Sequence, residues 1–209
     1  MPSPRFAGFA AALRERYRRL GTLWVLLPAL AAMAAFVLLF QVTGRMVADE
    51  GIDVLHLQKS FTPERFGAVV AAWGDGIEAF KWSLIMLDFA FPLLYAAALA
   101  GLIAVAGGPA PRRAALVLFC LPWAAAGFDW VENLLHLWLL ADVHHAADAA
   151  AAAYPALPVA AASTAAMVKF ALLFAASAGA VILALRRRSW WAAATGAALF
   201  ASFTPVLWA

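Results

Sequence analysis

Apolar stretches long enough to cross a lipid bilayer recur four times along the chain, at about 23–43, 80–106, 114–141 and 159–185. A helix rises about 1.5 Å per residue, so roughly 20 apolar residues cross the hydrocarbon core. Helices suit lipid because they satisfy their backbone hydrogen bonds internally. The pattern therefore predicts an all-α, polytopic transmembrane helix bundle that forms a single membrane domain over residues 1–209.

A fifth apolar stretch at 190–208 follows an arginine cluster and is bounded by aromatic residues. Aromatic side chains of this kind collect at bilayer interfaces. The stretch is just long enough to span, but Thr204 and Pro205 interrupt its end. Either a fifth span or a tilted, interfacial helix fits this pattern, so we expect four or five spans.

The segment 44–79 is too long for a simple connection and is expected to contain structure of its own. Thr62 followed by Pro63 has the pattern of an N-cap with proline at the first helical position. Gly74 is placed to end this helix. An apolar stripe at helical spacing predicts that it lies on the outer surface of the bundle or at the headgroups, and the stripe consists of Phe66, Val69, Val70 and Trp73.

Two shorter segments have weaker patterns. Residues 54–58 alternate apolar and polar side chains too briefly to predict a strand. Residues 146–153 are rich in alanine and indicate either the end of a helix or a loose turn.

Composition supports the membrane assignment. Hydrophobic residues make up 66% of the chain, charged residues only 13%, and the mean hydropathy is +0.86. Soluble domains are about half apolar and a quarter charged. Cys120 is the only cysteine, which excludes a disulfide framework or a thiolate metal cage within one chain.

The net charge of +3 comes from basic clusters that flank apolar stretches, which indicates membrane topology rather than binding to nucleic acid. The amino-terminal tail, the turn at 112–113 and the cluster at 186–188 fall on one side of the alternating spans. The positive-inside rule then predicts a cytoplasmic amino terminus. We expect a multi-pass protein of the cell inner (plasma) membrane, with membrane lipids as its partners. The loops 44–79 and 142–158 are expected outside.

Ionisable residues inside the predicted spans are the candidate chemistry. Each costs about 2.5–3.5 kcal/mol at the centre of a membrane helix unless it is paired or hydrated. We count the depth of each residue from the outer end of its span at about 1.5 Å per residue. The depths agree, so we expect these residues to meet. The depths are about 12 Å for Asp88, about 18 Å for Asp129, about 13 Å for Glu132 and about 15 Å for Lys169.

Helical spacing places polar residues on single faces of two spans. Pro92 lacks an amide hydrogen, so it is expected to kink its helix and to free the carbonyl of Asp88 for another partner. One face carries Asp88, Pro92 and Tyr95, and the other carries Asp129, Glu132, Asn133 and His136.

These residues have several candidate roles. Asp88, Asp129, Glu132 and Lys169 are the candidate catalytic residues, while Tyr95, Asn133, His136 and Thr164 are candidate substrate-binding residues. The alternative for Asn133, Ser163 and Thr164 is hydrogen bonding between helices, and for His136 a place at the wet interface.

The charge balance leaves two further alternatives. Three carboxylates face one lysine, so either some carboxylates hold protons or a divalent cation binds to Asp88, Asp129 and Glu132. Haem held between two spans is disfavoured, because only one span has a histidine well inside.

The motifs DxxFPxxY at 88–95 and DxxEN at 129–133, with Ser163-Thr164 ahead of Lys169, resemble an uncharacterised family of small bacterial membrane proteins with four spans. The resemblance covers about residues 23–185 and includes the Thr62-Pro63 helix start. It implies a four-span fold and the same polar positions, and no particular reaction. The segment after Arg188 departs from the family pattern.

The sequence supports three functions. One is an intramembrane enzyme that acts on a lipid or isoprenoid, with a carboxylate as general acid or base and Lys169 stabilising negative charge. Another is a structural or assembly subunit, or a small-ligand binding protein, whose polar cluster is a rigid core. The third is a proton- or cation-coupled transporter.

Overall fold

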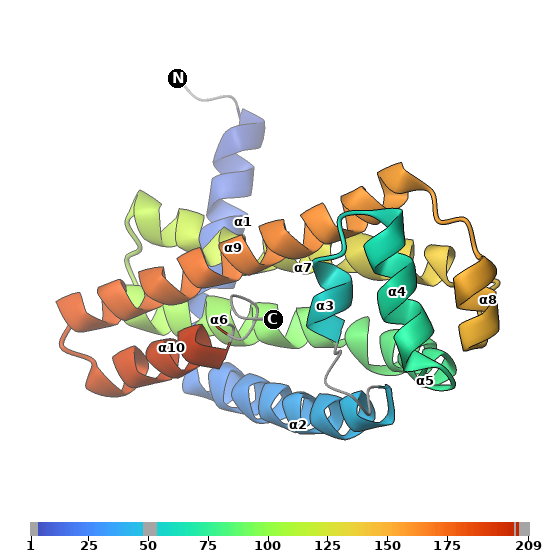
Figure 1. Ribbon diagram of the computed structural model, residues 1–209. Helices are drawn as coiled ribbons and strands as arrows, with labels where there is room; N and C mark the ends of the chain where they lie inside the picture. The colour runs from blue at the N-terminus through green and yellow to red at the C-terminus, as the bar shows by residue number, and fades with distance from the viewer. Residues whose placement is uncertain (1–3, 48–53, 203, 205–209) are drawn as a thin grey trace. The chain divides into compact units, whose positions relative to one another are not determined.

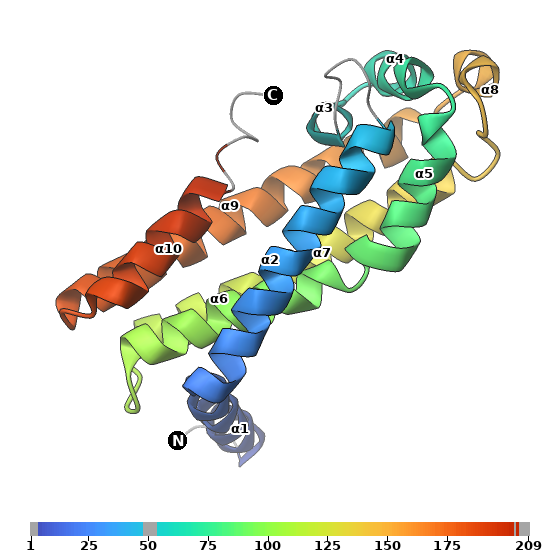
Figure 2. The same ribbon diagram turned by 90° about the horizontal axis from the view of Figure 1, so that it is seen from below.

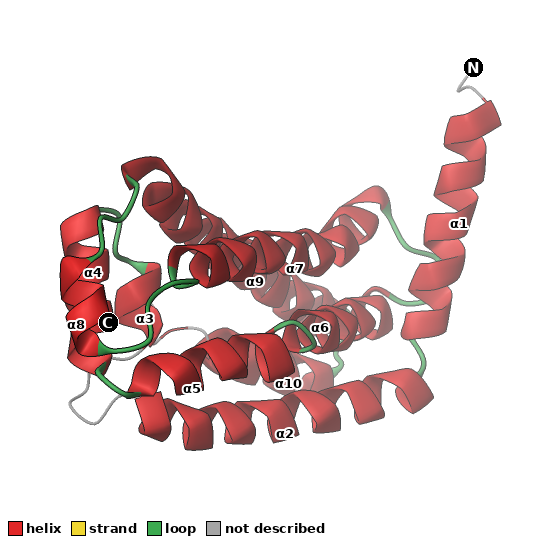
Figure 3. Ribbon diagram, turned by 90° about the vertical axis from the view of Figure 1, so that its right-hand side faces the viewer, coloured by secondary structure: helices red, strands yellow, loops and turns green. Residues whose placement is uncertain are grey.

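The computed structural model describes residues 4–47, 54–202 and 204 of the chain. Over these residues the chain is helical and contains no strand (Figure 3), which confirms the all-α prediction. The elements are α1 Pro4–Leu20, α2 Leu23–Val47, α3 Val54–Gln58, α4 Pro63–Trp73, α5 Gly76–Ser83, the π-helix η1 Leu84–Asp88, α6 Phe91–Gly107, α7 Arg113–Leu139, α8 Ala146–Ala151, α9 Ala156–Arg186 and α10 Trp190–Ser202.

Two helices, α7 and α9, are each long and apolar enough to cross a membrane. Two bent pairs meet the same test only together: 8–20 with 23–39, bent by 72°, and 76–88 with 91–107, bent by 42°. The described residues thus contain two candidate spans, or four if each bent pair is one span. The 13 residues of α10 rise only about 20 Å, so the described part of the 190–208 stretch is short of a full crossing.

The chain forms two compact units, and α7 and α9 contribute residues to both. Whether the two units form a single membrane domain depends on how they pack together, so the single domain stays a prediction. The first unit comprises Met1–Met33, Leu93–Ala125 and Ala171–Thr204, and the second comprises Ala34–Pro92, Ala126–Phe170 and Pro205–Ala209.

Small residues bring helices close together in the first unit. A Cβ placed on Gly196 of α10 would lie 3.0 Å from a methyl of Val181 on α9, and α10 runs back along α9 (Figures 1 and 2). A Cβ on Gly179 would overlap the Leu118 side chain of α7. Helices in lipid gain association energy from such close packing, because burial of apolar surface gives no advantage there.

Four short helices, α3, α4, α5 and α8, gather in the second unit (Figures 1 and 3). Their apolar side chains form one core with the end of α7 and the start of α9. A Cβ on Gly67 of α4 would lie 3.2 Å from the Tyr154 ring, so glycine allows this ring to pack closely on α4. The core includes Leu57, Phe66, Val70, Trp73, Ile77, Phe80, Leu84, Leu140, Val143 and Tyr154.

Helix α4 confirms the prediction made for its segment. The Thr62 hydroxyl accepts a hydrogen bond from the Arg65 amide at 3.4 Å, and Pro63 occupies the first helical position. Gly74 ends the helix at φ 55°, a left-handed conformation that glycine adopts without strain. The predicted stripe faces the core, with Phe66, Val70 and Trp73 buried and Val69 partly buried.

The two segments with weak patterns are also helical. Residues 54–58 form α3, and 146–151 form α8. The Asp148 carboxylate stabilises the start of α8, because it accepts hydrogen bonds from the amides of His144 and His145 at 3.1 Å each. One side chain thus pairs two amides that have no partner within the helix.

The Thr62 cap gives a prediction for stability. Thr62→Ala removes the acceptor for the Arg65 amide, and we expect it to lower the free energy of unfolding by about 1 kcal/mol. Thr62→Ser keeps the hydroxyl and should keep most of that stability. Chemical denaturation in detergent micelles measures both variants, and an equal loss in the two would contradict the capping role.

Asp148 gives a prediction for pH. The hydrogen bonds from the His144 and His145 amides hold the pKa of this carboxyl below its ordinary value of 3.8. Its contribution to the stability of α8 is therefore present above that value and is lost as the pH falls through the lowered pKa. We expect hydrogen-exchange protection of these two amides to fall in this range, and Asp148→Asn, which cannot ionise, to abolish the transition. Wild-type protection that stays constant down to pH 2 would refute the prediction.

Candidate functional site

A buried ion cluster lies in the second unit, where Lys169 of α9 meets two carboxylates of α7. The Lys169 ammonium lies 2.9 Å from Oδ1 of Asp129 and 2.7 Å from Oε2 of Glu132. Asp129 and Glu132 are three residues apart and share one face of α7, so one ammonium reaches both. Their exposed fractions are 5% for Lys169, 2% for Asp129 and 1% for Glu132. The structure thus brings together three residues that sequence depth predicted to meet.

Gln58, at the end of α3, completes the pairing of Glu132. Its side-chain Nε2 donates to Oε1 of Glu132 at 2.6 Å, and only 6% of the residue is exposed. Both oxygens of Glu132 therefore have a partner, one the Gln58 amide and the other the Lys169 ammonium. Sequence reasoning missed Gln58, because it lies outside the apolar stretches in a segment with no clear periodicity.

A break in the backbone lies beside the cluster. The π-helix η1 ends at Asp88, and α6 begins at Phe91, just before Pro92. The Asp88 carbonyl accepts a hydrogen bond from Nδ2 of Asn133 at 3.1 Å, as expected of a carbonyl freed by Pro92. The next carbonyl, of Phe89, accepts from Nε1 of Trp130 at 3.1 Å. Two side chains of α7 thus replace the hydrogen bonds that the break removes.

His136 is buried, so its interpretation as a residue of the wet interface is wrong. Only 1% of it is exposed, because Phe66 of α4 and Phe80 of α5 pack with ring centroids 6.0 and 6.2 Å from its ring. Its Nδ1 lies 4.0 Å from Oε1 of Glu132, longer than a hydrogen bond. His136 lies near the end of its span, so sequence alone placed it at the membrane surface. Helices α4 and α5 cover it there.

Oε2 of Glu132 is held by its ion pair with Lys169, whereas three neutral buried atoms around the ion cluster have no hydrogen-bond partner among the described residues. They are Oε1 of Gln58, Oδ1 of Asn133 and Nε2 of His136. Buried polar atoms in native proteins nearly always have a partner, so each such atom needs an explanation such as a bound water or ligand. Their three side chains adjoin Glu132 and the Asp88 carbonyl, which makes this group the strongest candidate for a binding site in the second unit.

The remaining candidates lie elsewhere. Thr164 is exposed, and its hydroxyl donates to the Ala160 carbonyl of its own helix at 2.7 Å. It is five residues before Lys169, which places it on another face of α9. Tyr95 is buried in the first unit, on α6. The structure does not bring Thr164 into the cluster, while Ser163, the preceding residue of α9, is buried.

The carboxylates do not converge on a metal site in the described part of the chain. No group of three or more His, Cys, Asp or Glu side chains there is arranged to hold a metal ion. Lys169 lies between Asp129 and Glu132, in the place that a shared cation would take. Asp88 is only partly buried, and its carbonyl pairs with Asn133.

Comparison of the chain with protein-family models, curated protein sequences and solved structures gave no match. The resemblance of its motifs to a family of four-span membrane proteins therefore stays a prediction. The function is inferred from the geometry of the cluster.

Lys169 gives a prediction for this site. Lys169→Met leaves two carboxylates buried without their cation, and we expect the free energy of unfolding to fall by about 3–5 kcal/mol. Adding Asp129→Asn and Glu132→Gln to this variant should restore most of the loss. Arg113→Met removes an exposed cation from α7 and should change stability by less than about 0.5 kcal/mol. Unfolding in detergent micelles measures all variants, and equal losses for Lys169→Met and Arg113→Met would contradict the pairing.

Proposed function

We propose that this protein is a membrane-embedded enzyme that acts by general acid–base catalysis on the polar end of a lipid or isoprenoid. The observation that carries the proposal is the group of unpartnered atoms on Gln58, Asn133 and His136 beside a paired ion cluster. A polar ligand there would supply the missing hydrogen bonds.

The roles follow from the contacts. Glu132 is the proton-transfer residue, because Gln58 and Lys169 hold its two oxygens in one orientation and ready proton transfer needs a positioned group. Lys169 stabilises negative charge that develops on the substrate, and Asp129 positions Lys169. Asn133 and His136 bind the polar group of the substrate through Oδ1 and Nε2.

The apolar outer surface of α7 favours a lipid substrate, because it places the buried cluster in a helix that lipid would surround. Phe128, Val131 and Leu134 have exposed fractions of 40%, 48% and 58%. In a membrane these side chains would contact acyl chains. They lie on the side of α7 opposite Asp129 and Glu132, so a lipid would reach the cluster from another side of the helix.

The alternative is a structural core. Lys169 is paired with two carboxylates, and the cluster is almost fully buried, as expected of residues that hold α3, α7 and α9 together. Hydrogen bonds between membrane helices are worth about 0.6–2 kcal/mol each, so the cluster would stabilise the unit without any reaction.

The distribution of charge supports a cytoplasmic amino terminus in a cell inner (plasma) membrane. The first unit contains ten of the 15 basic residues of the chain and Glu15 as its only acid. Positive residues are retained on the cytoplasmic side. The cluster at Glu132 would then lie toward the outer leaflet.

An activity assay separates the two functions. Purified protein is reconstituted in D₂O into vesicles of phosphatidylethanolamine, phosphatidylglycerol and a polyprenyl phosphate, and the lipids are analysed by mass spectrometry. We expect wild type and the exposed-site control Thr164→Val to hydrolyse or deuterate one lipid, and Glu132→Gln to lower the rate at least about 100-fold. If wild type changes none of these lipids while Glu132→Gln lowers stability, the structural core is the better account.

A further inference from the structure

A basic cavity of about 380 Å³ lies in the first unit, where the α6–α7 turn meets the end of α9. Three arginines line it: Arg112 before α7, and Arg186 and Arg187 at the end of α9. Among the described residues none of the three forms an ion pair with a carboxylate. The cavity therefore concentrates positive charge that no carboxylate of the described residues pairs with.

The acids of the first unit cannot balance this charge. Glu15 is its only acidic residue, and this carboxylate already pairs with Arg18 and Arg19 at 2.8 Å each. A second, adjoining cavity shares Ala110 with the first and is lined by Arg14 and Arg18. The described residues of the first unit thus offer no further acid as a counter-charge, and an external anion could supply it.

Backbone geometry adds to the anion site. Ala114 and Ala115, in the first turn of α7, line the cavity, and the amides of a first turn have no partner within their helix. These amides and the helix dipole favour an anion. Gly108 has φ +75°, and a Cβ there would overlap the Arg187 guanidinium. Glycine thus allows Arg187 to lie directly against the turn, which holds its charge at the cavity.

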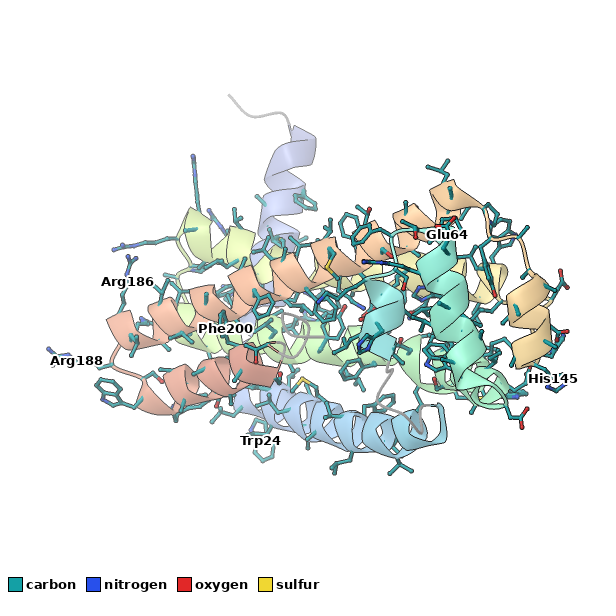
Figure 4. All side chains as sticks on the ribbon, in the orientation of Figure 1. Trp24, Glu64, His145, Arg186, Arg188 and Phe200 are labelled. Atoms are coloured by element: carbon teal, nitrogen blue, oxygen red, sulfur yellow. The ribbon has the colours of Figure 1, made fainter. Side chains whose placement is uncertain are left out.

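The depth of the cavity identifies the source of the anion. Trp190 and Trp191 follow Arg187 by three and four residues, with 72% and 48% of their surfaces exposed. Exposed tryptophans of membrane proteins sit at the level of the lipid headgroups. Arg186 and Arg188 extend outward from the same turn (Figure 4). The cavity therefore opens at headgroup depth, where phosphate groups of lipids are the most abundant anions.

We propose that this cavity binds the phosphate of an anionic phospholipid headgroup, through Arg112, Arg186, Arg187 and the first-turn amides of α7. Arginine suits this role because its planar guanidinium pairs with two phosphate oxygens. Basic pockets between membrane helices are a known form of headgroup site. The proposal does not depend on a catalytic role for Glu132.

Lipid binding by paired double variants tests the proposal. The full chain in neutral-detergent micelles is titrated against fluorescently labelled phosphatidylglycerol and phosphatidylcholine, and fluorescence anisotropy gives each apparent Kd. Arg112→Gln with Arg187→Gln removes two charges from the cavity. Arg113→Gln with Arg188→Gln removes the same charge from adjacent positions outside the lining. We expect the first pair to weaken phosphatidylglycerol binding about 25-fold, at about fivefold per arginine, and the second pair to weaken it less than about threefold.

Each other outcome overturns the proposal. Equal weakening by the two double variants would mean that general attraction to positive charge, and not the cavity, binds the lipid. Equal affinity of wild type for phosphatidylcholine and phosphatidylglycerol would mean that the net charge of the headgroup is not recognised. Inorganic phosphate and unlabelled phosphatidylglycerol are also tested as competitors of the labelled lipid. If phosphate displaces the labelled lipid at the same concentration as unlabelled phosphatidylglycerol does, the cavity binds free anions and not a lipid headgroup.

Discussion

The placement of one ammonium between two carboxylates constrains the second unit more than any other contact. Lys169 can neutralise Asp129 and Glu132 only if α9 lies within reach of one face of α7. If both carboxylates ionise, one negative charge remains, and the Gln58 amide offsets part of it. The ion cluster thus also requires α3, outside the apolar stretches, to fold back onto α7. A buried charge that lost any of these partners would be costly, so α3, α7 and α9 are all needed to stabilise the cluster.

The break at Asp88 depends on the same face of α7. Pro92 removes an amide, and the π-helix ahead of it leaves carbonyls without their usual partners. In water such carbonyls would be hydrated, but among apolar helices they need side-chain donors. Asn133 and Trp130 supply these donors, so one helix satisfies both the ions and the interrupted backbone. The DxxEN motif from Asp129 to Asn133 therefore serves two purposes on one helix face: its acids pair with Lys169, and its asparagine pairs with the interrupted backbone at Asp88.

Sequence patterns predicted the parts of this structure that depend on local spacing. Helix α4 was predicted from its cap, stripe and terminal glycine, and the meeting of Lys169 with α7 was predicted from depth. Contacts that the short helices of the second unit make with the long helices were not predictable from the sequence. His136 was expected near the surface because only its distance from the span end was known, and α4 covers it. Gln58 had no signal, since a five-residue helix has too few positions to show a period.

The unpartnered atoms are the strongest argument that the cluster does more than hold helices together. A core selected for stability alone would pair each polar atom or replace it with an apolar one, since an unpartnered buried donor or acceptor costs about 1–3 kcal/mol. Here the charged atoms of Lys169 and Glu132 are paired, while neutral atoms of Gln58, Asn133 and His136 are left over around them. Direct contacts between the helices explain the first group and not the second. A neutral, hydrogen-bonding molecule bound among them, either a water or a ligand, explains both, because it pairs the leftover atoms without disturbing the charges.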